Sequence, residues 1–167
     1  MGMSLFDVIL SRTSIRRYED KEIPKDVLDK IVEAGRQSPS AVNKQPYRFV
    51  IVTDSEIKQE LSKGLLSSFL KNAPVIIVGC ANPKALLTGK WATVDTAIAL
   101  ENMVLAAWSL GIGSCWIGSF KEQKIKELLK IPQDWKVVAL ITFGYPAETP
   151  KPRKKKPTNK LFSLNKF

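Results

Sequence analysis

The sequence contains no histidine among its 167 residues, and it has only two cysteines, Cys80 and Cys115. The lack of histidine excludes a Ser-His-Asp triad, a Cys-His dyad and any metal site with imidazole ligands. The two cysteines do not have the spacing of a zinc site or of a redox pair. If the chain is an enzyme, we therefore expect its difficult chemistry to come from a bound organic cofactor.

Long hydrophobic runs are also missing. No apolar run reaches the ~18 residues that are needed to cross a bilayer. The longest candidate, residues 91–110, contains Asp95 and Glu101. No basic segment leads into an apolar stretch at the start of the sequence, so no signal peptide is predicted. We therefore expect a cytoplasmic protein.

Acidic residues are scarce relative to basic ones, with 16 against 26 and a formal net charge of +10. Seven of the basic residues lie after residue 148, where no acidic residue occurs. The excess charge is therefore mainly a property of the C-terminal tail. Such a tail can bind nucleic acid, an anionic membrane surface or a single phosphate group. Binding to nucleic acid is disfavoured, because no aromatic residues interleave the basic run at 151–156 and no known nucleic-acid-binding domain is recognisable.

Length and a hydrophobic content of 44% are typical of one globular domain. Helical periodicity and capping signals predict helices over residues 4–11, 24–37, 55–65, 91–110 and 122–129. Ser4 with Asp7 and Asp54 would cap the first and third of these, Leu65 would lie on the inner side of the third, and Gly111 would end the fourth. Apolar or β-branched runs predict strands at residues 49–52, 75–78 and 136–143, with the first two buried on both faces. Because helices open the chain and cluster, we expect an α+β fold in which helices pack on a mixed sheet.

A stiff polar loop is predicted at residues 39–47, which read PSAVNKQPY. Pro39 should end the preceding helix near Ser38, and Pro46 should hold the chain extended into the next strand. A constrained loop with serine, asparagine and glutamine between a helix and a strand can form half of a ligand site. Taken alone, it is equally compatible with a plain helix-to-strand connection.

Two further segments have patterns suited to binding. Arg12, Ser14 and Arg16 alternate along the chain, so they would lie on one side of an extended segment and could bind an anion. A solvated charged stretch would have the same pattern. Residues 111–118 read GIGSCWIG, and their three glycines allow close backbone approach to a flat or anionic group. Glycines are also common after a helix simply because they end it.

Together with Gly144-Tyr145-Pro146 and the basic tail, these segments resemble the FMN-dependent nitroreductase family in order and spacing. The likeness covers nearly the whole chain, and residues 39–47 are its most specific part. It implies a central, mostly antiparallel sheet flanked by helices, and an intertwined homodimer with two FMN sites at the subunit interface. Residues 1–157 would form a single FMN-binding domain. The tail at 158–167, which is rich in leucine and phenylalanine, would dock on the partner subunit.

The resemblance also implies a set of cofactor-binding residues, carried over position by position. The set is Arg12, Thr13, Ser14, Arg16, Pro39, Ser40, Ala41, Asn43, Trp116, Ile117, Gly118, Arg153 and Lys155. The first segment would bind the flavin phosphate and ribityl chain, with Arg16 at the pyrimidine edge to stabilise the anionic reduced flavin. The 39–43 segment would reach the flavin from the other subunit. A backbone N–H near Ile117 and Gly118 would lie near flavin N5, and the tail residues would close the phosphate site.

In function, the resemblance implies hydride transfer from NADH or NADPH through FMN to a nitroaromatic, quinone or similar small acceptor, by a ping-pong cycle. No side chain would act as a nucleophile. The alternative is a flavin-binding protein with little turnover. The chain is short for the family and lacks the inserted helical segment that covers the substrate pocket of longer members. Three assignments stay open: a pyrimidine contact within residues 65–72, Lys154 in place of Lys155, and Trp116 as cofactor contact or ordinary core.

Overall fold

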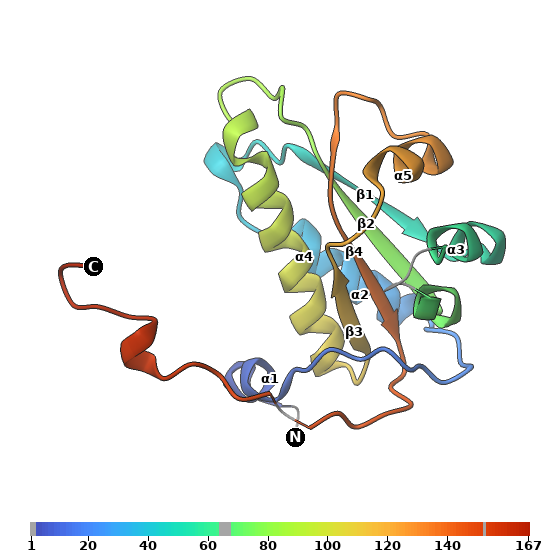
Figure 1. Ribbon diagram of the computed structural model, residues 1–167, viewed down its shortest axis with the longest axis horizontal. Helices are drawn as coiled ribbons and strands as arrows, with labels where there is room; N and C mark the ends of the chain where they lie inside the picture. Colours follow the sequence, from blue (N-terminus) through green and yellow to red (C-terminus); the bar gives the residue numbers. More distant parts are fainter. Residues whose placement is uncertain (1–2, 64–67, 152) are drawn as a thin grey trace.

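The computed structural model describes residues 3–63, 68–151 and 153–167. Helices pack on both faces of a four-stranded sheet, and the C-terminal tail extends away from this body (Figure 1). The helices and strands are α1 (Leu5–Ser11), α2 (Lys25–Arg36), β1 (Tyr47–Val52), α3 (Ser55–Leu61), β2 (Val75–Ala81), α4 (Ala92–Ser109), β3 (Gly113–Ile117), α5 (Glu122–Leu129) and β4 (Lys136–Gly144). The predicted α+β class is confirmed.

The sheet has the strand order β1-β2-β4-β3, and each neighbouring pair is antiparallel. Outside these strands, Ser14 forms an isolated parallel bridge with Ser114 of β3. This arrangement agrees with the mixed, mostly antiparallel sheet that was expected. The bridge is important for the site, because it attaches the segment after α1 to the outer edge of β3.

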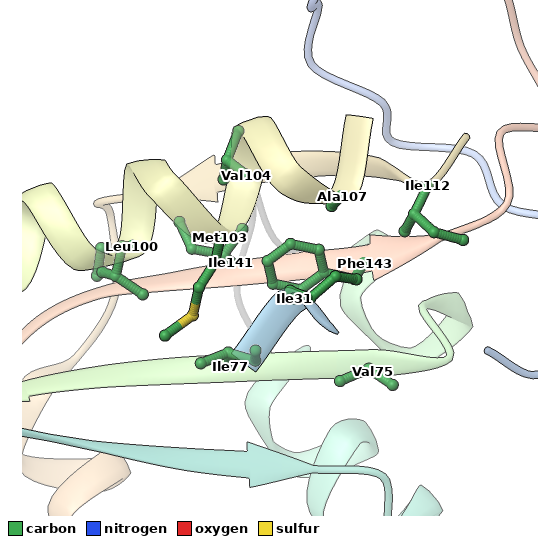
Figure 2. Packing of buried hydrophobic residues seen from close by; sticks show 11 residues of the cluster. Ile31, Val75, Ile77, Leu100, Met103, Val104, Ala107, Ile112, Ile141 and Phe143 are labelled. Carbon is green, nitrogen blue, oxygen red and sulfur yellow. The ribbon is translucent and has the colours of Figure 1, made fainter. Parts of the chain in front are cut away.

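The two central strands, β2 and β4, alternate their side chains between two apolar clusters. Val75 and Ile77 point to a cluster that α2 and α4 cover, together with Phe143 of β4 (Figure 2). Ile76 and Val78 point to the opposite cluster, beneath α3 and α5. Every residue of β2 is buried, so the prediction of a strand buried on both faces is confirmed for this element.

Local signals in the sequence explain most helix ends. Ser4 and Asp7 form the predicted capping box at the start of α1, and the Asp54 carboxylate accepts a hydrogen bond from Ile57 N at the start of α3. Gly111 follows α4 with φ +76°, a left-handed conformation that glycine adopts without steric cost. The helix after Pro24 begins one residue later than expected, at Lys25. Leu65, which was predicted on the inner side of the third helix, lies outside the described residues.

Two expectations about strands need correction. Residues 49–52 were expected to be buried on both faces, but only Val52 is buried in this chain, because β1 is an edge strand with a single strand neighbour. The glycine-rich segment after α4 forms strand β3, which was not predicted. Gly113 suits this strand because a Cβ there would lie only 2.7 Å from Ile15 Cγ1.

Large apolar side chains are exposed on the tail and on helices α1 and α4, among other places. The tail carries exposed Leu161, Phe162, Leu164 and Phe167, and it extends away from the body (Figure 1). The other exposed apolar residues on α1 and α4 are Leu5, Phe6, Ile9, Leu10, Val94 and Ile98. Exposed apolar side chains in such number are typical of surfaces that contact another protein. Of the described helices, none is long and apolar enough to span a membrane.

Candidate functional site

The segment after α1 lies against the edge of β3, and this contact decides which way its side chains point. Ile15 N donates to the Ser114 carbonyl over 2.9 Å, and the Ile15 side chain is 1% exposed because it packs at Gly113. Side chains on either side of an inward residue in an extended chain point the opposite way. The structure therefore places Ser14 and Arg16 on the outer side of this segment, as the sequence predicted.

Three of the predicted residues influence one buried side chain, Cys115 of β3. Burial raises the pKa of the Cys115 thiol, and the Arg16 guanidinium, the Ser14 hydroxyl and the Arg12 guanidinium oppose this rise. The bridge between Ser14 and Ser114 holds the segment that carries all three residues along the edge of β3. Two cations and a hydroxyl on this edge can hold an anionic group.

Glu148 fixes the backbone of this segment from the far end of the sequence. Its Oε1 accepts hydrogen bonds from Arg16 N at 2.6 Å and Arg17 N at 3.0 Å, and its Oε2 accepts one from Arg17 Nε at 3.3 Å. The Arg16 N–H is the main cause that lowers the pKa of Glu148. Sequence reasoning missed this residue, because no local pattern links it to a partner 132 positions away.

The replacement Glu148→Gln is expected to remove part of the pH dependence of stability. The folded-state pKa of Glu148 is lowered, so its stabilising effect is complete above the unfolded value of about 4.3 and is lost as pH falls through the folded pKa. At pH 7 we expect the variant to lose about 1 kcal/mol of unfolding free energy. Urea unfolding at pH 7 and in strong acid measures this loss, and an equal loss at both pH values would contradict the assignment.

The loop at residues 39–47 is a structured turn rather than a plain connection. Its 3-10 helix, η1 (Ala41–Asn43), contains left-handed residues, with φ 44° at Val42 and 56° at Asn43, and Gln45 follows with φ 51°. The turn is closed by a hydrogen bond from Gln45 N to Ser40 Oγ of 3.0 Å. Helix α2 ends at Arg36, close to the boundary that Pro39 predicted.

The end of β3 presents backbone rather than side chains. Gly118 is exposed, and nothing within 4 Å would meet a Cβ there, so a flat group can approach this backbone closely. Ile117 is buried in the cluster beneath α5. The Trp116 indole points to the α4 side, where its Nε1 donates to Glu101 Oε2 over 2.8 Å and its ring packs on the first cluster. The indole thus has a core position, while the backbone beside it stays available.

A cavity of about 950 Å³ begins at Arg16 and continues between residues 18–23 and 71–75. Lys71 and Asn72 line it as well, so two polar residues of the 65–72 segment share this cavity with Arg16. Residues 65–67 of that segment lie outside the described residues. The sequence alone offered no way to select Lys71 and Asn72, since the signal was only a pair of polar residues shortly before a buried strand.

The remaining predicted residues lie elsewhere. Arg153 and Lys155 are exposed on the extended tail, as is their rival Lys154. The 39–47 loop lies at the opposite end of α4 from Arg12 and Ser14 (Figure 1). Its Ala41 N donates to Asp95 in the first turn of α4, whereas Ser11 Oγ accepts from Trp108 Nε1 in the last turn. Thirteen helical residues separate these two contacts, or about 20 Å. One chain therefore does not bring the two halves of the predicted site together.

The sequence model of the Nitroreductase family matches residues 9–75 and 61–145. The chain belongs to the nitroreductase family. Among its relatives, a putative NADH dehydrogenase/NAD(P)H nitroreductase of Methanothermobacter thermautotrophicus is 36% identical over 89% of this chain and 80% of its own length. This nitroreductase also resembles an FMN-dependent nitroreductase from Clostridium difficile R20291, with 34% identity, a TM-score of 0.86, and coverage of 96% of this chain and 98% of that one.

One of the similar solved structures belongs to a longer protein. The NADPH:FMN oxidoreductase from Vibrio harveyi, solved in complex with NAD⁺, is 26% identical with a TM-score of 0.89. The match covers 98% of this chain but only 77% of the Vibrio protein. In this nitroreductase the connection from β2 to α4 holds only a short turn and the 3-10 helix η3 (Gly89–Trp91). The chain is therefore shorter than this relative, and the absence of a helical segment over the substrate pocket stays a prediction.

Proposed function

We propose that this nitroreductase uses FMN to transfer hydride from NADH or NADPH to a small acceptor such as a nitroaromatic or a quinone, in a ping-pong cycle. Relatives named FMN reductase and NADPH-flavin oxidoreductase support the cofactor and the reductant. The observation that carries the proposal is the attachment of the segment with Arg12, Ser14 and Arg16 to the edge of β3, through the Ser14–Ser114 bridge and the hydrogen bond from Ile15 N to the Ser114 carbonyl.

The residues at this edge fit FMN in charge and in shape. Arg12 and Ser14, with Thr13 between them, would hold the phosphate and ribityl chain, because guanidinium and hydroxyl groups are good phosphate partners. Arg16 would lie at the pyrimidine edge, next to the cavity that Lys71 and Asn72 line. The open backbone at Ile117 and Gly118 would lie along the isoalloxazine.

The second half of the site would come from another copy of the chain. Pro39, Ser40, Ala41 and Asn43 lie about 20 Å from Arg12 along α4, so they can reach a flavin only across a subunit interface. The exposed apolar residues of α1, α4 and the tail supply surface for such a homodimer. Residues 1–157 would form the FMN-binding domain, and residues 158–167 would dock on the partner, which brings Arg153 and Lys155 toward a phosphate.

When bound, FMN supplies the hydride chemistry through its N5 atom. The chain's own residues bind and orient the cofactor, and they stabilise developing charge. Arg16 does this at the pyrimidine edge, where a positive group favours the reduced, anionic form. Orientation of the reductant and then the acceptor against the flavin supplies the rest, so no nucleophilic side chain is required. The cytoplasm stays the predicted compartment.

Native mass spectrometry during an FMN titration tests this arrangement. A site built from two subunits should give a dimer that binds two FMN molecules, and the monomer should retain none. Arg12→Ala should lower the occupancy without changing the dimer mass. FMN bound tightly to a stable monomer would contradict the shared site.

A further inference from the structure

Asp95 is a buried carboxylate that none of the predicted cofactor contacts includes. It lies in the first turn of α4 and is 4% exposed. Its two oxygens lie 3.3 and 3.2 Å from Ala41 N, so the Ala41 N–H donates to the carboxylate. The positive end of the helix dipole favours a negative charge at this position. A buried charge of this kind has to be held by specific partners. The partner of Asp95 is Ala41 N, at the start of residues 41–45, which we call the crest of the loop.

The loop needs such an anchor because its backbone is strained. Val42, Asn43 and Gln45 all have positive φ, although none is glycine. The left-handed conformation is unfavourable for Val42 and Gln45, although asparagine tolerates it, and it persists only where the surrounding structure fixes it. The other contacts of the crest are internal: Gln45 N donates to Ser40 Oγ, and Gln45 Nε2 donates to the Asn43 carbonyl. Among the hydrogen bonds of the described residues, the Ala41–Asp95 pair is the one that links this crest to α4.

Neighbouring side chains place Asp95 beneath the loop. Asn102, two turns further along α4, donates from Nδ2 to Ser38 Oγ over 2.8 Å at the base of the loop. Burial, and after it the negative charge of Asp95, raises the pKa of Tyr47. Tyr47 follows directly after the loop in β1. One helix face therefore supports the loop at its base and at its crest.

We propose that Asp95 is a positioning residue for the flavin site of the other subunit. Its carboxylate fixes the conformation of the 39–45 loop in its own chain, and that loop completes the site whose phosphate half is supplied by Arg12 of the second chain. This inference rests on the proposed function, and in particular on the shared site. It assigns an effect in trans to a residue that lies about 20 Å from the phosphate half of its own chain's site.

The first test compares FMN affinity and loop protection in two variants. Asp95→Ala removes the acceptor, and we expect the FMN dissociation constant to rise about tenfold. Asp95→Asn keeps one oxygen that can accept from Ala41 N and should recover most of the affinity. In the FMN-free protein, amide hydrogen exchange within residues 41–45 should speed up most in Asp95→Ala, less in Asp95→Asn, which loses only the charge, and not in the control variant. Thr96→Val is the matched control, because Thr96 is buried on the same turn but bonds only to its own helix.

Unchanged FMN affinity in Asp95→Ala would overturn the proposal, as would equal losses in Asp95→Ala and Thr96→Val. If Asp95→Ala does not fold, amide hydrogen exchange of the loop in Asp95→Asn and Thr96→Val still tests the proposal. Faster exchange at residues 41–45 in Asp95→Asn only is the expected result, and protection equal to that of Thr96→Val contradicts the role.

The second test uses mixed dimers of Asp95→Ala with Arg12→Ala chains, isolated with two affinity tags. In such a dimer one site combines the intact Arg12 of the first chain with the intact loop of the second. We expect it to bind one FMN with wild-type affinity, although both parent homodimers bind weakly. A mixed dimer without a wild-type site would show that Asp95 acts within its own subunit. If instead the Arg12→Ala homodimer binds FMN as the wild type does, the proposed site itself is wrong.

Discussion

A chain shortened to residues 1–149 is expected to be a monomer that binds FMN at least about 100-fold more weakly than the full chain. The shortened chain lacks Arg153 and Lys155, which would pair with the phosphate. It also lacks Leu161, Phe162 and Leu164, whose apolar surface is exposed in the single chain and is available to a partner. Size-exclusion chromatography with light scattering gives the oligomeric state, and quenching of flavin fluorescence gives the affinity.

Two full-length variants separate the contributions of charge and docking. Arg153→Ala with Lys155→Ala should weaken FMN binding but leave a dimer, whereas serine at positions 161, 162 and 164 should weaken the dimer while keeping every basic residue. Lys154→Ala, compared with Lys155→Ala, decides which lysine faces the phosphate. A shortened chain that stays dimeric and binds FMN normally would show that the tail has neither role.

The second large effect is expected at Arg16, in the redox potential of the bound flavin. A cation at the pyrimidine edge stabilises the anionic reduced form, so Arg16→Ala should lower the midpoint potential by about 30–60 mV, which is a 10- to 100-fold change in the two-electron equilibrium. Arg16→Lys should restore part of this shift, since it keeps the charge. Equilibrium reduction against a dye of known potential measures the change.

Arg17→Ala is the matched control for this experiment. Arg17 is the neighbouring residue and has the same charge, but its guanidinium forms an ion pair with Glu148. We expect its loss to change the midpoint potential by less than about 10 mV, because that charge is already compensated. Equal shifts in the two variants would mean that the midpoint potential responds only to the net charge of this segment. The assignment of Arg16 to the pyrimidine edge would then be wrong.

Local sequence patterns predicted those parts of the fold whose causes are local. The Ser4 and Asp54 caps, the left-handed Gly111 and the fully buried β2 each follow from a few adjacent residues, and the structure confirms them. The strand at Gly113–Ile117 was not predicted, because it begins with a glycine and is flanked by two more, and glycine is a poor strand former. Gly113 is tolerated here because β4 pairs with this strand on one side and Ile15 packs closely on it.

The candidate site likewise contains residues that local patterns predicted and residues that they missed. The alternation of Arg12, Ser14 and Arg16 predicted one shared side, and the structure places their segment along the edge of β3 with Ile15 pointing inward between them. Glu148 and Asp95 were missed because their partners lie 132 and 54 positions away. Such contacts depend on the completed fold and leave no periodic signal in the sequence. The separation of the two halves of the site along α4 likewise became visible only in the structure.

The most direct test of the account is the visible spectrum of the purified protein under argon, before and after addition of NADH and then NADPH. We predict a bound flavin whose absorbance bleaches promptly with at least one nucleotide and returns when a nitroaromatic or a quinone is added. A flavin spectrum that neither nucleotide changes would contradict the reductase and leave a flavin-binding protein. A colourless protein that takes up no FMN on incubation would contradict the flavin site at Arg12, Ser14 and Arg16 altogether.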